Sequence, residues 1–313
     1  MSHSLDPSLT GLKGALRYVR AYRDQVFVVK LGGEVLQDAE VLDQVATQLA
    51  LLHSLSIRLV VVHGGGPQAS ALTRRMGQEP VMIGGRRVTD DAALEVTKMV
   101  YAGLLNTDLI AALREHRVQP VGLTGVDADL LTAHRRPPVD LVGDDGRPER
   151  VDFGHVGDVD RVDVRVLTTL MDARFVPVVA SLAGDDEGNV YNVNADTVAE
   201  AIATALRAQK LIFLTGAPGV LRDRNDPSTL VTFADPDDLA ELMQSGALTG
   251  GMKPKVEACI RAATGGVERT HIVDGRQADA LLTEVFTGSG CGTMIVGRKE
   301  KATYLGVDLA SRD

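Results

Sequence analysis

Apolar runs alternate along the chain with stretches in which apolar residues recur at helical spacing. Residues 26–31 form a continuous apolar run that is broken only by Lys30, and residues 59–62 form a second, β-branched run. Between them, residues 35–55 carry apolar side chains at the spacing of a buried helix face. Strand, helix and strand in this order make a βαβ unit, which builds a parallel sheet.

The same alternation continues toward the C-terminus and sets the fold class. We predict an α/β protein with a mainly parallel central sheet and helices on both of its faces. The further strands are expected at 119–123, 176–181, 211–214, 269–273 and 293–296, and the further helices at 92–116, 164–174, 196–207, 253–264 and 278–286.

Three stretches stand apart from this alternation. Residues 139–163 are polar and rich in Gly and Asp, and residues 185–194 contain the turn sequence Asp-Glu-Gly-Asn of a hairpin. We place a boundary between two lobes near residue 190. Before the first strand, residues 8–24 carry apolar side chains at helical spacing. This extra helix either forms oligomer contacts or packs on its own subunit.

Composition narrows the classes of function. The formal net charge is −9, whereas a nucleic-acid-binding protein normally shows a basic surplus. No apolar run approaches the roughly 18 residues of a transmembrane helix, and residues 1–10 lack the apolar core of a signal peptide. The two cysteines, Cys259 and Cys291, form no CxxC pattern. We therefore expect a cytoplasmic protein without a structural zinc site, a nucleic-acid partner or a membrane partner.

Two glycine-rich turns follow predicted strands and precede predicted helices. They are residues 30–33 (Lys-Leu-Gly-Gly) and residues 63–67 (His-Gly-Gly-Gly-Pro). Glycine lets the backbone approach a ligand closely and take positive φ, and the next helix N-terminus offers free N–H groups to an anion. Two such turns on neighbouring strands can flank one anion, although each turn taken alone fits a purely steric role equally well.

Known glycine motifs offer three competing interpretations of these turns. Residues 64–69 fit the GxGxxA pattern of dinucleotide-binding proteins, but they follow the second strand, contain a Pro and lack a convincing ribose-binding acid further on. Residues 63–66 match the HGGG loop of esterases, but the chain has no GxSxG elbow. The Walker A pattern GxxxxGK[ST] is absent as well. These absences favour a phosphate cradle outside the P-loop class.

Eight short segments, taken in order along the chain, resemble the amino-acid kinase family. They are 29–33 (VKLGG), 62–67 (VHGGGP), 87–90 (RVTD), 192–196 (NVNAD), 214–215 (LT), 250–255 (GGMKPK), 271–275 (HIVDG) and 292–295 (GTMI). The resemblance implies a three-layer αβα sandwich, the amino-acid kinase fold, around one continuous and mainly parallel sheet. It also implies an acid-substrate lobe at residues 25–190 and an ATP-binding lobe at residues 191–313.

The resemblance implies an activity. Segments 87–90 and 192–196 together resemble the acetylglutamate branch of the family, which transfers the γ-phosphoryl group of ATP to the side-chain carboxylate of N-acetyl-L-glutamate in arginine biosynthesis. Residues 106–108 and 133–138 look more like the kinase domain of fused synthase–kinase relatives. Two alternatives stay open: a sister kinase for another N-blocked acidic amino acid, such as an aminoadipate derivative, and a non-catalytic sensor of arginine or a nucleotide.

Phosphate chemistry is assigned by the resemblance to Lys30, Lys255 and Asp196. A carboxylate is already ionised at neutral pH, so the transfer needs no general base but does need charge neutralised at the γ-phosphoryl group. The two lysines match the family positions that do this, and Asp196 matches the aspartate that holds both. Lys253 is an alternative to Lys255. Without the resemblance, the lysines would be solvated surface residues and Asp196 a helix N-cap.

The resemblance also implies a set of contacts to the acid substrate. Arg87 would clamp a substrate carboxylate with its planar guanidinium, with Arg86 as an alternative. Asn192 would hydrogen-bond the same substrate, unless it serves only the hairpin turn. The backbone N–H groups of Gly65 and Gly66 would contact the substrate from the second glycine turn.

Four further residues occupy positions on the nucleotide side of the family site. Gly32 and Gly33 would face the phosphates of ATP, across the transferred group from the second glycine turn. Thr215 and Gly216 would bind the nucleotide, and Gly216 stands where many relatives carry Asp, which puts the nucleoside contacts in doubt. Mg²⁺ is expected with ATP, held mainly by phosphates and water, and no protein ligand is named for it.

A regulatory site is the last implication of the resemblance. In arginine-inhibited relatives, positions similar to His271 and Glu284 flank an arginine site, together with an N-terminal helix that carries a tyrosine. Residues 1–24 would supply that helix here, with Tyr18 as the tyrosine. This implies L-arginine as an effector and a homo-oligomer, either a hexamer built as a trimer of dimers or a dimer. Core packing of His271 is the alternative.

Overall fold

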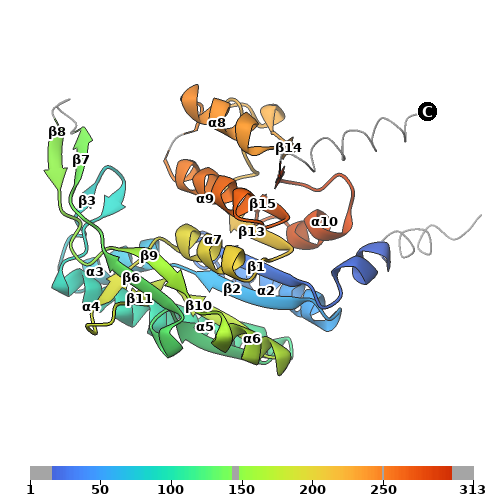
Figure 1. Cartoon of the computed structure of the whole chain (residues 1–313), viewed down its shortest axis with the longest axis horizontal. Coiled ribbons are helices and arrows are strands. Elements are labelled where there is room, and N and C mark those ends of the chain that lie inside the picture. Colours follow the sequence, from blue (N-terminus) through green and yellow to red (C-terminus); the bar gives the residue numbers. More distant parts are fainter. Residues whose placement is uncertain (1–15, 143–147, 249, 298–313) are drawn as a thin grey trace, which may run out of the picture.

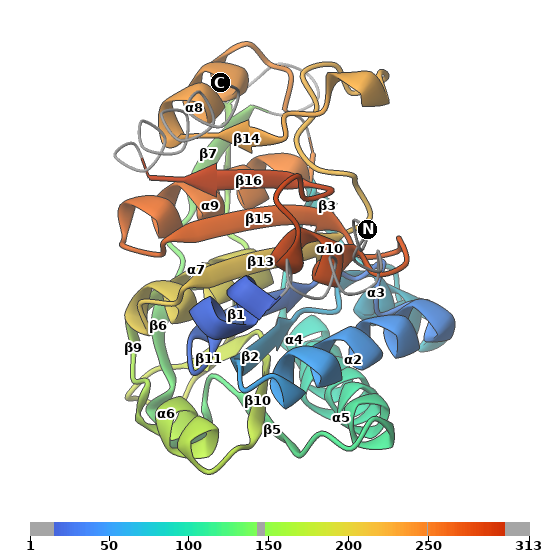
Figure 2. The ribbon, with the colours of Figure 1, turned by 90° about the vertical axis from the view of Figure 1, so that its right-hand side faces the viewer.

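The computed structural model describes residues 16–142, 148–248 and 250–297, which are built around one eight-stranded sheet (Figure 1). The strand order is β14-β16-β15-β13-β1-β2-β10-β5, and Figure 2 shows the strands stacked in this order. All neighbouring strands pair in parallel except β15 and β16. The bounds are β1 (Val26–Leu31), β2 (Arg58–His63), β5 (Pro120–Thr124), β10 (Val176–Ala180), β13 (Lys210–Thr215), β14 (Phe233–Ala234), β15 (Arg269–Asp274) and β16 (Thr293–Val296).

Helices cover both faces of this sheet, which confirms the predicted α/β fold in three layers. One buried apolar cluster includes residues of α6 (Arg165–Asp172), α7 (Ala195–Ala205), α8 (Pro236–Gln244) and α9 (Met252–Thr264). The other includes residues of α2 (Ala39–Ser54), α5 (Asn106–Glu115) and α10 (Ala280–Phe286). No helix in these described ranges combines the length and the apolarity needed to cross a bilayer.

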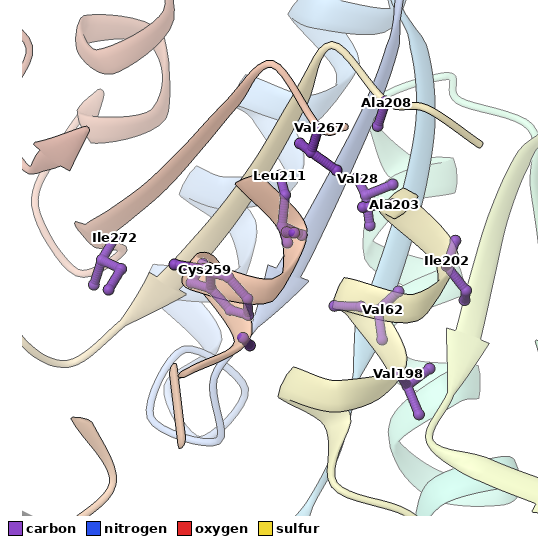
Figure 3. Close-up of a cluster of buried hydrophobic side chains, with 14 of the residues drawn as sticks. Val28, Val62, Val198, Ile202, Ala203, Ala208, Leu211, Cys259, Val267 and Ile272 are labelled. Carbon is purple, nitrogen blue, oxygen red and sulfur yellow. The ribbon is translucent and has the colours of Figure 1, made fainter. Parts of the chain in front are cut away.

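The central strands are mostly apolar because both of their faces are buried. Val28 belongs to the first cluster and Val29 to the second, since successive residues of a strand point to opposite faces. Figure 3 shows part of the first cluster, in which Val198 of α7 lies near Val62 of the sheet and Cys259 of α9 lies near Leu211. This double coverage explains why the strands read as unbroken apolar runs rather than as alternating ones.

The helix predicted from residue 35 begins only at Ala39. Its N-cap is Asp38, whose side chain accepts hydrogen bonds from the backbone N–H groups of Glu40 and Val41. The prediction that this helix offers free N–H groups to an anion directly after the first glycine turn is therefore wrong. The second turn differs, because α3 (Gly66–Arg75) begins within it and has no side-chain cap.

The helix predicted at 92–116 is continuous but not uniform. It consists of α4 (Asp91–Lys98), the π-helical segment η1 (Met99–Leu105) and α5. A π-helix is wider than an α-helix and hydrogen-bonds residues five apart, so it changes which side chains share a face. The apolar periodicity of the sequence did not reveal this change.

Short antiparallel elements extend the fold at one end, where β3, β7 and β8 project in Figure 1. Strands β11 and β12 are antiparallel, which confirms the predicted hairpin. The polar stretch 139–163, for which no strand was predicted, forms β7, β8 and β9. The bounds are β3 (Met82–Ile83), β4 (Arg86–Arg87), β6 (Leu131–Arg135), β7 (Val139–Val142), β8 (Pro148–Val151), β9 (Gly157–Val162), β11 (Leu182–Gly184) and β12 (Val190–Asn192), with 3₁₀ helices η2 (Asp127–Asp129) and η3 (Pro227–Thr229).

The predicted N-terminal helix is described only over residues 16–22, and residues 8–15 lie outside the described ranges. Tyr22 is buried and packs edge-on against Phe27 of β1, with 5.2 Å between the ring centroids. This part of the helix therefore packs on its own subunit.

Candidate functional site

The candidate site lies at the carboxyl ends of the central parallel strands, where open α/β sheets bind their ligands. Lys30 stands at the end of β1, with His63 and Thr215 at the ends of its two neighbours, β2 and β13. Residues from segments that are far apart in the sequence thus meet at one edge of the sheet.

Asp196 joins the two lysines that the sequence singled out. The Nζ atom of Lys30 lies 2.7 Å from Oδ1 of Asp196, and Nζ of Lys255 lies 3.2 Å from Oδ2. All three side chains are largely withdrawn from solvent, with exposures of 8%, 17% and 6% for Lys30, Lys255 and Asp196. With two ammonium groups on one carboxylate, the cluster carries one uncompensated positive charge in a poorly solvated place, which attracts an anion.

The position of Asp196 in α7 differs from that of a helix cap. Asn194 caps α7 instead, and its side chain accepts a hydrogen bond from the Asp196 N–H at 2.8 Å. The interpretation of Asp196 as an N-cap is therefore wrong. Burial raises the pKa of Asp196, but the charges of Lys30 and Lys255 outweigh burial and hold that pKa below its usual range. The carboxylate is ionised at neutral pH.

A cavity of about 520 Å³ opens beside Lys255, a size that suits a small-molecule ligand. Thr215 and Gly216, which were predicted to bind the nucleotide, both line it, and so does Glu34. Lys253, the alternative to Lys255, is exposed and is not part of the lining. The structure thus brings Lys255, and not Lys253, to both the ion pair and the cavity.

The two glycine turns, residues 32–33 and 64–67, lie against each other. Gln68 donates a hydrogen bond from Nε2 to the Gly33 carbonyl at 3.1 Å, and a Cβ added to Gly33 would lie 3.0 Å from the proline ring of the second turn. A Cβ on Gly32 would lie 2.9 Å from a backbone oxygen of β13. None of these glycines takes a left-handed φ. Close packing therefore favours glycine at Gly32 and Gly33, and the expectation of positive φ is wrong.

The residues predicted to hold the acid gather on the other side of the second turn. Arg87 donates from Nη2 to the Gly66 carbonyl at 2.9 Å, whereas its neighbour Arg86 is exposed. Burial lowers the pKa of Arg87. Asn192 donates from Nδ2 to Oγ1 of Thr89 at 3.2 Å. Because Thr89 lies two residues after Arg87, the structure brings Gly66, Arg87 and Asn192 into one neighbourhood.

A second polar cluster is centred on His271 and is buried. Its Nδ1 lies 2.6 Å from Oε1 of Glu284, and its Nε2 lies 2.9 Å from Nζ of Lys210. An ammonium group can only donate, so Nε2 accepts and the ring carries its hydrogen on Nδ1. Burial and the charge of Lys210 lower the pKa of His271 to about 4, and the ring is neutral at physiological pH.

Lys210, which completes this cluster, is not among the residues predicted from the sequence. Lys210 is the first residue of β13 and directly precedes its apolar run, much as Lys30 lies near the end of the apolar run of β1. A lysine that borders a buried strand is a sequence signal that could have identified Lys210. Its Nζ lies 5.1 Å from the ring centroid of Tyr22, on which Tyr18 stacks at 6.0 Å. Tyr18 therefore joins the edge of the cluster through Tyr22.

Comparisons with known proteins show the family of this chain. The sequence profile described as "Amino acid kinase family" matches residues 25–274. An acetylglutamate kinase from Myxococcus xanthus is 49% identical over 298 residues, which cover 95% of this chain and 96% of that protein. Acetylglutamate kinases from Symbiobacterium thermophilum and Methanothrix thermoacetophila are 44% and 41% identical, over 91% and 90% of this chain and 96% of each relative.

Solved structures share the fold. The N-acetylglutamate synthase from Neisseria gonorrhoeae, complexed with coenzyme A and N-acetyl-glutamate, matches with a TM-score of 0.78 at 27% identity. The match covers 93% of this chain, which spans only 64% of the length of that synthase. The carbamate kinase from Giardia lamblia bound to AMP-PNP matches with a TM-score of 0.59 at 16% identity, over 87% of this chain and 98% of that one, and shows the fold alone.

Proposed function

Because the chain belongs to the amino acid kinase family, we propose that it transfers the γ-phosphoryl group of ATP to the side-chain carboxylate of N-acetyl-L-glutamate. The product is an acyl phosphate, and the step belongs to arginine biosynthesis. One observation carries the proposal: Asp196 pairs with both Lys30 and Lys255 beside a cavity. This cluster occurs in a chain that is 49% identical to the acetylglutamate kinase from Myxococcus xanthus.

The chemistry follows from charge. Both reactants are anions, and the acceptor carboxylate is already ionised, so the main tasks are to bring the two together and to stabilise negative charge on the transferred group. Lys30 and Lys255 would meet the phosphoryl oxygens from two directions. Asp196 would hold both ammonium groups in place, which removes the cost of arranging them during the reaction.

ATP would occupy the cavity beside Lys255, with Thr215 and Gly216 in its wall and with Gly32 and Gly33 facing the phosphates. Mg²⁺ would be held mainly by phosphate oxygens and water, as suits its preference for octahedral oxygen coordination. The described ranges contain no group of three or more His, Cys, Asp or Glu residues arranged for a metal, and we name no protein ligand.

The acid would lie between the second glycine turn and the segment that carries Arg87. Arg87 would bind a substrate carboxylate through its guanidinium, which now donates to the Gly66 carbonyl. Asn192 and the backbone N–H groups of Gly65 and Gly66 would complete the contacts. In this proposal residues 25–190 form the acid lobe and residues 191–313 the ATP lobe.

Acyl-phosphate trapping tests the proposed function. The purified protein is incubated with Mg-ATP, hydroxylamine and N-acetyl derivatives of L-glutamate, L-aspartate and L-aminoadipate, and hydroxamate is measured. We expect the highest kcat/KM with N-acetyl-L-glutamate, by roughly 10- to 200-fold, since one methylene group is worth about 1–3 kcal/mol. Turnover of only the aminoadipate derivative would reassign the substrate. No hydroxamate with any of the acids would favour the non-catalytic sensor.

We further propose that L-arginine regulates this cytoplasmic enzyme through the cluster of Tyr18, His271 and Glu284, and that the protein is a homo-oligomer, either a hexamer or a dimer. The cluster joins the N-terminal helix to β15 and α10 through Tyr22 and Lys210. Arginine should inhibit hydroxamate formation, and Tyr18→Ala should raise the inhibitory concentration without lowering kcat. Unchanged inhibition in that variant would remove Tyr18 from the site.

Assembly is tested separately from inhibition. Removal of residues 1–15 keeps Tyr22 in the chain and should reduce the number of subunits per particle, measured by analytical ultracentrifugation, if the N-terminal helix joins dimers into a hexamer. An unchanged number of subunits would assign the N-terminal helix to its own subunit alone.

A further inference from the structure

A buried histidine and a buried asparagine form a chain of hydrogen bonds to the second glycine turn. His63 ends β2 directly before the turn, and its side chain is inaccessible to solvent. Its Nδ1 lies 2.9 Å from the Gly64 carbonyl oxygen, and its Nε2 lies 3.0 Å from Nδ2 of Asn106. Neither side chain lines the cavity beside Lys255, so neither has a role in the function proposed so far.

The partners of Asn106 determine which nitrogen of His63 carries the hydrogen. Nδ2 of Asn106 also lies 3.1 Å from the backbone oxygen of Val178, which can only accept. The amide nitrogen therefore donates one hydrogen to Val178 and the other to Nε2 of His63. The remaining ring nitrogen, Nδ1, carries the hydrogen and donates it to the Gly64 carbonyl. Burial lowers the pKa of His63 to about 4, so the ring keeps this neutral form at physiological pH.

Fixing the Gly64 carbonyl fixes the whole peptide unit, because a trans peptide is planar and its N–H points away from its C=O. The N–H of Gly65 therefore points away from His63. Tyr101 and Leu105 pack against Gly65: a Cβ added to Gly65 would overlap the Leu105 side chain and lie 2.9 Å from Cε1 of Tyr101. Burial raises the pKa of the Tyr101 phenol, and the charge of Arg87 and a hydrogen bond with the Gly65 backbone oppose this rise. A backbone N–H that donates to the phenol oxygen has this effect, because it stabilises the ionised form.

The π-helical segment η1 explains how both supports reach the same turn. Tyr101 lies in η1, and Asn106 is the first residue of α5, five positions later. At the roughly 100° per residue of an α-helix, these side chains would point about 140° apart. In a π-helix, which hydrogen-bonds residues five apart, they lie on one face. The widened turn thus directs Tyr101 and Asn106 toward the same glycine turn.

We infer that His63, Asn106 and Tyr101 are positioning residues, which hold the Gly64–Gly65 peptide so that Gly66 and the start of α3 face the bound acid and phosphoryl group. This inference rests on the proposed function and deepens it. Gly66 borders open space, since a Cβ added there would meet no atom within 4 Å. The three side chains act through the backbone of the turn and do not touch the reacting atoms.

Paired substitutions test the inference. His63→Asn keeps an N–H donor near the position of Nδ1, whereas His63→Leu has none. We expect His63→Leu to lower kcat about 10- to 100-fold while KM for ATP stays within about twofold, because a small misplacement of binding groups has effects of this size. His63→Asn should keep kcat within about twofold of the wild type. Tyr101→Phe keeps the ring against Gly65 and should lower kcat about fivefold.

Hydrogen–deuterium exchange of the peptide that covers residues 62–68, measured without ligands, provides a readout that does not depend on activity. Exchange should be faster in His63→Leu and Tyr101→Phe than in the wild type and His63→Asn. Equal kcat and equal exchange in His63→Asn and His63→Leu would overturn the inference. If His63→Leu does not fold, Tyr101→Phe decides by the same two measurements. A wild type without kinase activity would reject the proposed function, and exchange would still decide the positioning role.

Discussion

Two lysines share one carboxylate at Asp196, so the charges of this cluster do not balance. A single buried lysine–aspartate pair would be neutral and could serve stability alone, and buried pairs are weak evidence even for that. Here Lys30 and Lys255 contact different oxygens of one carboxylate, at 2.7 and 3.2 Å. One positive charge remains without a partner within the cluster. An incoming phosphate is the kind of ligand that compensates it, while Asp196 keeps the lysines apart and oriented.

Substitution of Lys255 tests this account directly. Lys255→Ala should lower kcat by about 100- to 1,000-fold, since it removes a charge that stabilises the transferred group in a poorly solvated place. KM for the acid should change less than threefold. Lys253→Ala is the matched control: it removes the same charge two residues away on the exposed face of α9 and should leave kcat near that of the wild type. Hydroxamate kinetics that show equal losses in both variants would contradict a specific role for Lys255.

The elements that the sequence predicted well are those whose signal is local. β1 is found at its predicted bounds, because both of its faces are buried and its apolar run is unbroken except at Lys30. The start of α2 was misplaced because apolar spacing begins at residue 35, whereas the capping side chain of Asp38 sets the actual first turn. The strands within 139–163 were missed because each is short, with four to six residues, and the stretch as a whole is polar and rich in Gly and Asp.

The candidate site was predictable only in part. The short segments identified Lys30, Asp196 and Lys255 as members of one site, but no local property of the sequence brings them together. The irregular helix turn at η1 and the cluster of Tyr22, Lys210 and His271 were not foreseen. Both depend on which strand or helix packs against which, and this long-range information is absent from periodicity.

The cluster that connects β13, β15 and α10 predicts a dependence of stability on pH. The pKa of His271 is about 4 in the folded protein against an ordinary value of 6.5. As pH falls through this window, the unfolded chain binds a proton that the folded protein does not, so the free energy of unfolding decreases. Burial raises the pKa of Glu284, but hydrogen bonds from His271 and the backbone outweigh burial and hold it at about 2, so the loss continues below pH 4.5.

Melting curves at pH 7 and pH 5 measure this effect. His271→Gln should lower Tm at pH 7, because it disturbs a buried network, yet it should reduce the further fall in Tm at pH 5 by a few degrees. The comparison variant is His134→Gln, which removes an exposed histidine outside the buried cluster. Identical pH dependence in wild type and His271→Gln would exclude His271 as the source.

At the scale of the whole molecule, one sheet joins the two proposed lobes. β1 pairs with β13 in parallel along five residue positions, and β1 belongs to the first lobe whereas β13 belongs to the second. The larger apolar cluster contains residues of both lobes, such as Val28 and Leu239. The ion pairs repeat this pattern, because Lys30 comes from one lobe and Asp196 and Lys255 from the other. The site therefore exists only while the shared sheet holds the lobes in register.

This coupling predicts one cooperative unfolding transition in differential scanning calorimetry. Leu49→Ala in the first lobe and Leu239→Ala in the second each leave a cavity at a fully buried position, which costs about 2–5 kcal/mol. Both variants should shift the same single transition downward by several degrees, and Mg-ATP should shift that whole transition upward, because ligand binding stabilises every part that unfolds with the site. Two transitions, each sensitive to only one variant, would mean that the lobes fold separately and that docking, rather than a continuous core, brings Lys30 to Asp196.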